Sequence, residues 1–176
     1  MYAKITEEIQ QSYYKQNYPN EGQRFVAWYL RNIHGLDAAQ TKLAITDGAD
    51  DKQIDAIVID DDAQSIAVVQ GKFIGASGPV DAANLREVLA SWVQLKDLAQ
   101  LQQNANLKLK QRLTDLAQAL EDDYDIHFEL ITTGELTESA EKDLAAFQKE
   151  LADSDDFPAM LTLVNTDELT RRYELA

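Results

Sequence analysis

Three polar side chains end an otherwise apolar stretch, residues 47–73, and could act together. Asp55 directly precedes the run AIVID, while Gln70 and Lys72 close the run SIAVVQGK. Carboxylate and amide oxygens are ligands that suit a hard cation such as Mg²⁺, and an ammonium group can stabilise developing negative charge. These residue types suit metal-assisted chemistry on an anionic group, provided that the fold brings them together.

A β-hairpin would bring them together. Both runs are rich in Val and Ile, and the polar residues between them have the composition of a turn. A four-residue loop over residues 61–64 places Asp55 directly opposite Gln70, with Cβ atoms about 4.5 to 5.5 Å apart. Because side chains alternate along a strand, Lys72 then shares their face. A register shift of one residue would separate them. The alternative is a surface hairpin with a polar end, in which Lys72 pairs with an acid.

An aspartate followed one strand later by Gln-x-Lys resembles the core motif of the PD-(D/E)xK nuclease superfamily, in the variant of Mrr-like restriction endonucleases. More narrowly, DGADDKQIDAIVID followed by VVQGKF resembles the amino-terminal domain of abortive phage infection (AIPR) proteins. The resemblance implies that Asp55, Gln70 and Lys72 are catalytic, with Glu21 as the acid of the first helix of the family core. Gln53 stands where the family usually has a glycine.

The resemblance also implies a Mg²⁺ or Mn²⁺ cofactor, held by Asp55, the Gln70 amide oxygen and the backbone carbonyl of Gly71. Lys72 would orient the attacking water or stabilise negative charge. Since Gln replaces a carboxylate, we expect weak metal affinity that depends on Asp55. Two roles stay open for Glu21, which either assists the metal and positions Lys72 or complements a helix dipole.

Length and composition predict one soluble domain. The chain has 176 residues, no cysteine and two histidines, which excludes disulfides, Cys-based zinc sites and His-rich metal sites. Its apolar runs are short and its amino terminus does not resemble a signal peptide, so we expect a cytoplasmic protein without membrane contact. We expect a single nuclease-like domain over 1–176, made of amino-terminal helices (1–46), the motif hairpin (47–73), a helical pair (79–122) and a strand-helix-strand-helix unit (125–176).

Hydrophobic periodicity and capping residues predict the elements around the hairpin. The expected helices cover 3–17, 21–32 after Asn20, 38–45 after Asp37, two leucine-rich stripes at 85–101 and 109–120, 138–151 after Thr137, and a short helix after Asn165. The expected further strands are 126–133 and 160–164. This order predicts an α/β fold with a mixed central sheet flanked by helices. The resemblance implies a restriction-endonuclease-like αβββαβ core with a helical insertion after the Gln-x-Lys strand.

The formal net charge of −15 opposes a nucleic-acid partner, because affinity for DNA comes largely from Lys and Arg. Many acids gather in polar clusters at 60–62, 121–125 and 153–156, which we interpret as solvated turns away from a cleft. Three further acids, Asp47, Asp50 and Asp51, lack the rest of an EF-hand loop, so solvation explains them better than cation binding. The densest basic group, Lys108, Lys110 and Arg112, is the best candidate for weak nucleic-acid contacts.

Two functions are open. The first, implied by the resemblance, is a Mg-dependent endonuclease domain that hydrolyses phosphodiester bonds in anti-phage defence, with DNA as the expected nucleic acid. A second copy of the chain or additional C-terminal domains would supply further phosphate contacts. The alternative is a catalytically weak or inactive nuclease-like module that binds a protein partner, which the acidity favours.

Overall fold

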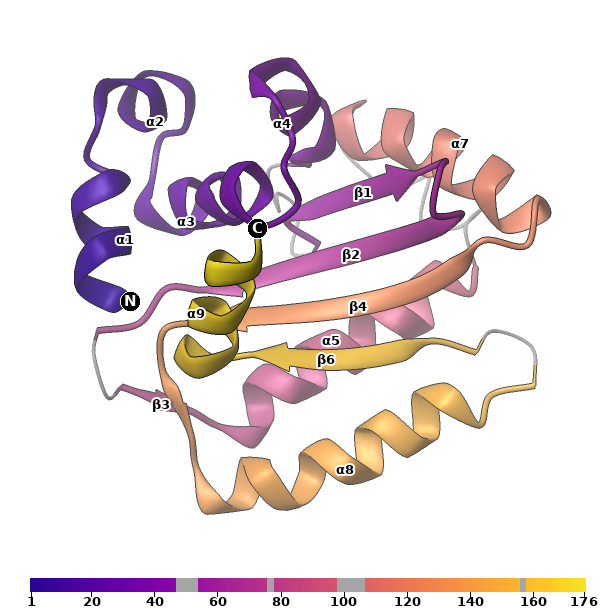
Figure 1. The fold of residues 1–176 in the computed structure, drawn as a ribbon. Helices are drawn as coiled ribbons and strands as arrows, with labels where there is room; N and C mark the ends of the chain where they lie inside the picture. Colours follow the sequence, from indigo (N-terminus) through magenta and orange to yellow (C-terminus); the bar gives the residue numbers. More distant parts are fainter. Residues whose placement is uncertain (47–53, 76–77, 98–106, 156–157) are drawn as a thin grey trace.

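A four-stranded mixed sheet forms the centre of the computed structural model, which describes residues 1–46, 54–75, 78–97, 107–155 and 158–176. The strand order is β1-β2-β4-β6, with β1 antiparallel to β2 and with β2, β4 and β6 parallel (Figure 1). The strands are β1 (Ala56–Asp60), β2 (Ser65–Lys72), β4 (Asp125–Thr132) and β6 (Met160–Val164), and a separate short parallel pair consists of β3 (Pro79–Val80) and β5 (Glu135–Leu136).

Helices cover both faces of this sheet (Figure 1). One face carries α1 (Tyr2–Glu8), α2 (Ser12–Asn17), α3 (Glu21–Asn32), α4 (Ala38–Ala44) and α9 (Thr166–Leu175). The other carries α5 (Ala82–Leu95), α7 (Leu107–Glu121) and α8 (Glu138–Ala152). Each face has its own apolar core, because strand residues alternate between the two layers. The predicted mixed sheet flanked by helices is therefore present.

The hairpin has the predicted register. Ile57 lies opposite Val68 and Asp60 lies opposite Ser65. The loop between the strands has four residues, and its last residue, Gln64, turns the chain with φ 54°. The pairing ends at Ala56 and Val69, and just beyond it the Asp55 N–H donates to the Val69 carbonyl at 3.0 Å. Three consecutive strands, β1, β2 and β3, thus precede α5, but β3 pairs with β5 outside the four-stranded sheet.

The predicted caps at Asn20, Asp37, Thr137 and Asn165 each accept the backbone N–H three residues later. The helix predicted over 3–17 is wrong, because the chain forms α1 and α2 with a turn between them. With this turn, Ile9 and Tyr14 are both buried. In a single straight helix these two side chains would point in different directions and could not both be buried against one surface. None of the described helices is both long enough and apolar enough to cross a lipid bilayer.

A buried carboxylate ties α3 and α9 to the sheet, on the face away from α5. Glu129 of β4 is 6% exposed and accepts hydrogen bonds from Tyr29 at 2.5 Å and Arg172 at 2.5 Å. His34 Nε2 lies 2.7 Å from the other carboxylate oxygen. Arg172 also bonds Glu168 at 2.9 Å, within α9. We call these five residues the Glu129 cluster. Its bonds offset the desolvation that a buried charge incurs.

The outer edge of β1 is occupied near its start. At its start, the backbone N–H of Thr46 donates to the Asp55 carbonyl at 2.9 Å, and Ile45 bridges to Ala56. Further along, Arg112 reaches from α7 and donates to the Ile57 carbonyl at 2.9 Å. These contacts from Ile45 and Thr46, which follow α4, and from Arg112 of α7 therefore fix the start of β1.

Candidate functional site

The structure brings Asp55, Gln70 and Lys72 to one face of the sheet, at the start of β1 and the end of β2. This is the face covered by α5, because Gln70 bonds Ser91 and Lys72 pairs with Glu87, both from that helix. Asp55 joins them, since the charges of Lys72 and Glu87 both act on its titration. The hairpin register is what makes these three side chains converge.

The Asp55 side chain is fixed by one hydrogen bond and remains partly exposed to solvent. One of its carboxylate oxygens accepts the Gly71 N–H at 2.8 Å, while the side chain keeps part of its surface exposed. Burial raises the pKa of this carboxyl, and Glu87 raises it further, whereas the Gly71 N–H and the Lys72 ammonium lower it. The negative charge of Asp55 is thus incompletely compensated, and the site favours an additional positive charge.

Gln70 presents an unsatisfied acceptor. Its side chain is 3% exposed, and its amide nitrogen donates to Ser91 Oγ. Ser91 itself donates to the Glu87 carbonyl at 3.1 Å, and its oxygen accepts from the Gln70 amide nitrogen. The Gln70 oxygen, at the other end of the amide, has no hydrogen-bond partner among the described residues. A buried amide oxygen without a partner costs about 1 to 3 kcal/mol, so this oxygen is available to accept a hydrogen bond or to coordinate a cation.

Glu87 adds a second carboxylate that the sequence interpretation missed. Its Oε2 lies 2.5 Å from Lys72 Nζ, and the two side chains are 31% and 26% exposed. The sequence interpretation took residues 85–101 only as a leucine stripe. The signal was present, because Glu87 and Ser91 are polar residues four apart in an apolar helix and so share one side of it. The capping box of Asp81 and Asn84 begins α5 and fixes that side against the sheet.

Gly71 supports the site through its backbone. The resemblance implied a role for its carbonyl, and the structure additionally uses its N–H to orient Asp55. A Cβ at this position would lie 2.7 Å from a methyl group of Val26 and 3.6 Å from Phe25, both in α3. Only glycine lets α3 pack so closely beneath the motif.

Glu21 is not part of this group. It begins α3, which covers the opposite face of the sheet, and its side chain is exposed. In the described part of the chain it has no hydrogen bond or ion pair with Asp55, Gln70 or Lys72. The position in the first turn of α3 is the one that complements a helix dipole.

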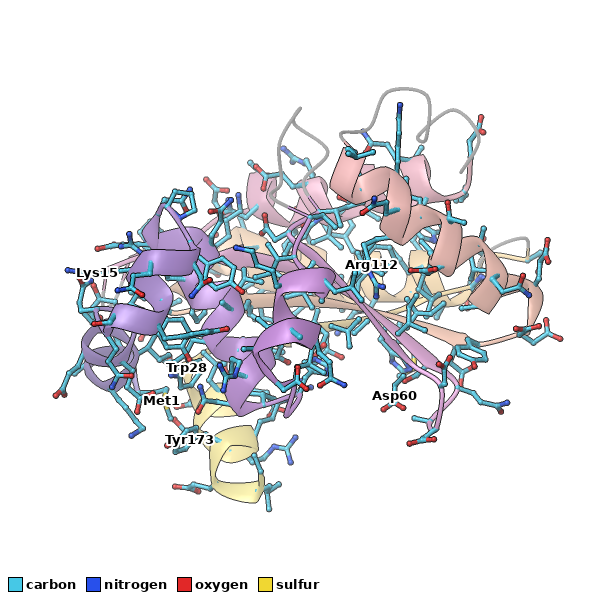
Figure 2. All side chains as sticks on the ribbon, turned by 90° about the horizontal axis from the view of Figure 1, so that it is seen from above. Met1, Lys15, Trp28, Asp60, Arg112 and Tyr173 are labelled. Carbon is cyan, nitrogen blue, oxygen red and sulfur yellow. The ribbon has the colours of Figure 1, made fainter. Side chains whose placement is uncertain are left out.

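The predicted basic group on α7 does not form one exposed surface. Arg112 is 7% exposed, donates to the Ile57 carbonyl and pairs with Asp115 at 3.1 Å (Figure 2). Its guanidinium is directed at the edge of β1 and not at the surface of α7, so the predicted contact with phosphate stays a prediction. Lys110 is exposed, while the side chain of Lys108 lies outside the described residues.

The donors fit a hard divalent cation by type. Two carboxylates and one unpaired amide oxygen supply oxygen ligands of the kind that Mg²⁺ takes, together with waters. No group of three or more His, Cys, Asp and Glu side chains able to hold a metal occurs in the part of the chain that the structure describes. The acids Asp47, Asp50 and Asp51 lie outside that part. A hollow of about 390 Å³ lies between α4 and α7 and contains none of the site residues. The candidate site is therefore identified by its side chains and not by this hollow.

Comparison with known proteins adds no assignment to this geometry. No protein-family model matches the chain, and no curated protein or solved structure matches it significantly.

Proposed function

We propose that the chain is a divalent-metal-dependent nuclease domain of the restriction-endonuclease-like type, hydrolysing phosphodiester bonds in foreign DNA. The observation that supports this most is the Gln70 side-chain oxygen, a buried acceptor without a partner among the described residues, on the sheet face that also carries Asp55 and Glu87. The order Asp, then Gln-x-Lys on paired strands, is the motif that the resemblance predicts for such an enzyme. Asp55, Gln70 and Glu87 are the residues that would hold Mg²⁺ or Mn²⁺.

Hydrolysis adds water across one P–O bond. A water oxygen bonds to phosphorus, its proton passes to a base, and the departing oxygen takes up a proton. When bound, the cation would neutralise phosphate charge and make a neighbouring water more acidic. The chain itself supplies Lys72, whose ammonium stabilises the negative charge that builds up on the phosphoryl oxygens. Glu87 holds Lys72 on the sheet face where Asp55 lies.

Ser91 has a positioning role in this proposal. It accepts from the Gln70 amide nitrogen and thereby fixes the orientation of the amide, which leaves the amide oxygen available to the cation. A Ser91→Ala variant would remove that acceptor and let the amide rotate. We expect a higher metal concentration for half-maximal activity, while the rate at saturating metal stays close to that of the parent chain.

A metal titration followed by unfolding tests the proposal. A ligand that binds only the folded state adds about 2.7 kcal/mol of stability at one hundred times its dissociation constant. We expect Mg²⁺ and Mn²⁺ to raise the melting temperature of the parent chain, and Asp55→Asn and Glu87→Gln to abolish that rise. Glu150→Gln, an exposed carboxylate on α8, is the matched control and should keep it.

Nuclease activity must follow the same pattern. Cleavage of plasmid DNA should require the metal and disappear in Asp55→Asn and in Lys72→Ala. Cleavage that persists with excess chelator, or in either variant, would refute the assignment.

The second candidate is a nuclease-like module that binds a protein partner, which the net charge of −15 favours. It predicts that metal ions leave the melting temperature unchanged in the parent chain and in all variants. The same titration therefore separates the two functions.

A further inference from the structure

Charge is divided unevenly between the amino-terminal helices and the rest of the chain. Residues 1–46 carry five of the 16 Lys and Arg but only four of the 31 Asp and Glu, so the large negative charge arises almost wholly after residue 46. The cations are Lys4, Lys15, Arg24, Arg31 and Lys42, and the acids are Glu7, Glu8, Glu21 and Asp37. The layer formed by α1–α4 is thus a part of this acidic molecule without an excess of carboxylates.

Three of these cations are held near the α2–α3 turn by neutral groups. Arg24 donates to the Tyr18 carbonyl at 3.0 Å and to the Pro19 carbonyl at 3.2 Å. Lys42 donates to a backbone carbonyl of α2 at 3.1 Å and lies 5.2 Å from the centre of the Tyr18 ring. Arg31 lies 4.7 Å from the centre of the Tyr13 ring. Carbonyls and aromatic rings position a cation without neutralising it.

Lys15 extends this group outward from α2, where it projects at the edge of the molecule (Figure 2). None of Lys15, Arg24, Arg31 and Lys42 pairs with a carboxylate in the described part of the chain. In contrast, Lys4 pairs with Glu8 at 3.0 Å. We call Lys15, Arg24, Arg31 and Lys42 the amino-terminal cationic surface.

Two connections join this surface to the candidate site. Arg24 directly precedes Phe25 and Val26, which pack against the backbone of Gly71 from beneath the motif. Lys42 lies in α4, which leads within four residues to Thr46 and its 2.9 Å bond to the Asp55 carbonyl. Both helices therefore attach to the strand ends that carry the site residues.

We propose that the amino-terminal cationic surface binds the phosphate backbone of the nucleic acid whose bond is cleaved at Asp55, Gln70, Glu87 and Lys72. This inference rests on the proposed function. Unpaired cations release counterions from phosphates when they bind, and this release provides most of the nonspecific affinity for DNA. The surface takes the role that the sequence interpretation gave to the basic group on α7.

A comparison of two charge reversals tests this surface. Lys15→Glu/Lys42→Glu changes two exposed residues of the surface, and Lys142→Glu/Lys149→Glu changes two exposed residues of α8 by the same net charge. Binding of a fluorescent DNA duplex is followed by anisotropy without metal, over a series of low salt concentrations.

Two lost phosphate contacts lower the slope of log affinity against log salt by about 1.8 and weaken binding at about 0.1 M salt by roughly 50-fold. We expect this loss for Lys15→Glu/Lys42→Glu and a much smaller one for the α8 pair. Equal losses in the two variants would overturn the proposal, because they would show that only the total charge matters. Urea unfolding of both variants verifies that each remains folded.

A small substrate separates this inference from the proposed function. Bis(p-nitrophenyl) phosphate has a single phosphodiester and therefore offers no flanking phosphate for the amino-terminal cationic surface to bind. We expect Lys15→Glu/Lys42→Glu to hydrolyse it at the parent rate while cleaving duplex DNA more slowly. If the parent chain does not hydrolyse it or DNA, the proposed function fails, and the binding comparison still decides whether the surface contacts phosphates. If duplex cleavage is unchanged in the variant, the surface is not the one used.

Discussion

Replacing Glu129 by Gln should remove a pH-dependent part of the stability of the fold. Burial alone would raise the pKa of this carboxyl, but bonds from His34 and Tyr29 and the charge of Arg172 outweigh it and lower the pKa from 4.5 to about 2. A folded-state pKa below the unfolded one stabilises the protein at pH above about 4.5, and this contribution is lost as the pH falls toward 2. The difference of about 2.5 pKa units corresponds to about 3 kcal/mol at neutral pH.

The assay is urea unfolding of the parent chain and of Glu129→Gln between pH 7 and pH 3.5. We expect the variant to be less stable by about 3 kcal/mol at pH 7 and by only about 2 kcal/mol at pH 3.5, because the parent has by then lost part of its advantage. The exposed control Glu150→Gln should follow the parent at each pH. A difference between parent and Glu129→Gln that does not change with pH would show that the cluster stabilises by packing and not by charge.

Further predictions concern the site and its support. Asp55→Asn should raise the free energy of unfolding at pH 7 without metal. Burial and Glu87 raise the pKa of the Asp55 carboxyl and so destabilise its charged form. Urea unfolding measures this change, and a variant less stable than the parent would contradict the prediction. Gly71→Ala should destabilise the fold by about 1 to 3 kcal/mol, since its Cβ would lie 2.7 Å from Val26; a melting temperature equal to that of the parent would show that α3 moves freely. At physiological salt and without metal, the parent chain should bind duplex DNA more weakly than the 10⁻⁴ to 10⁻⁶ M that is roughly usual for nonspecific binding, because the net charge is −15. Anisotropy decides this last prediction, and tight binding with a steep salt dependence would contradict it.

Local signals predicted the hairpin well. Side chains alternate between the two faces of a strand, and a four-residue turn then leaves only one register that buries Ile57 and Val68 together. From that register the convergence of Asp55, Gln70 and Lys72 follows without knowledge of the rest of the fold. The capping residues likewise predicted where several helices begin, since a cap bonds only to its own first turn.

The contribution of α5 could not be predicted in the same way. Which side of that helix meets the sheet depends on packing between segments far apart in sequence, so Glu87 looked like any partly exposed acid. The burial of Arg112 has a similar origin, because its partner is a carbonyl of β1, 55 residues away. Glu129 lies within the strand predicted over 126–133, but its partners come from α3 and α9, which the local sequence does not reveal.

The occupied start of the β1 edge has a consequence for how the protein behaves at high concentration. An outermost strand with open backbone groups is a template on which another molecule can add a strand, and short length and charged neighbours guard against this. Here Arg112 occupies the Ile57 carbonyl and Thr46 occupies that of Asp55. An uncharged residue in place of Arg112 would therefore leave folding largely intact yet promote aggregation through this edge. Movement of Thr46 away from β1 would likewise promote aggregation through this edge, because it would expose the backbone carbonyl of Asp55.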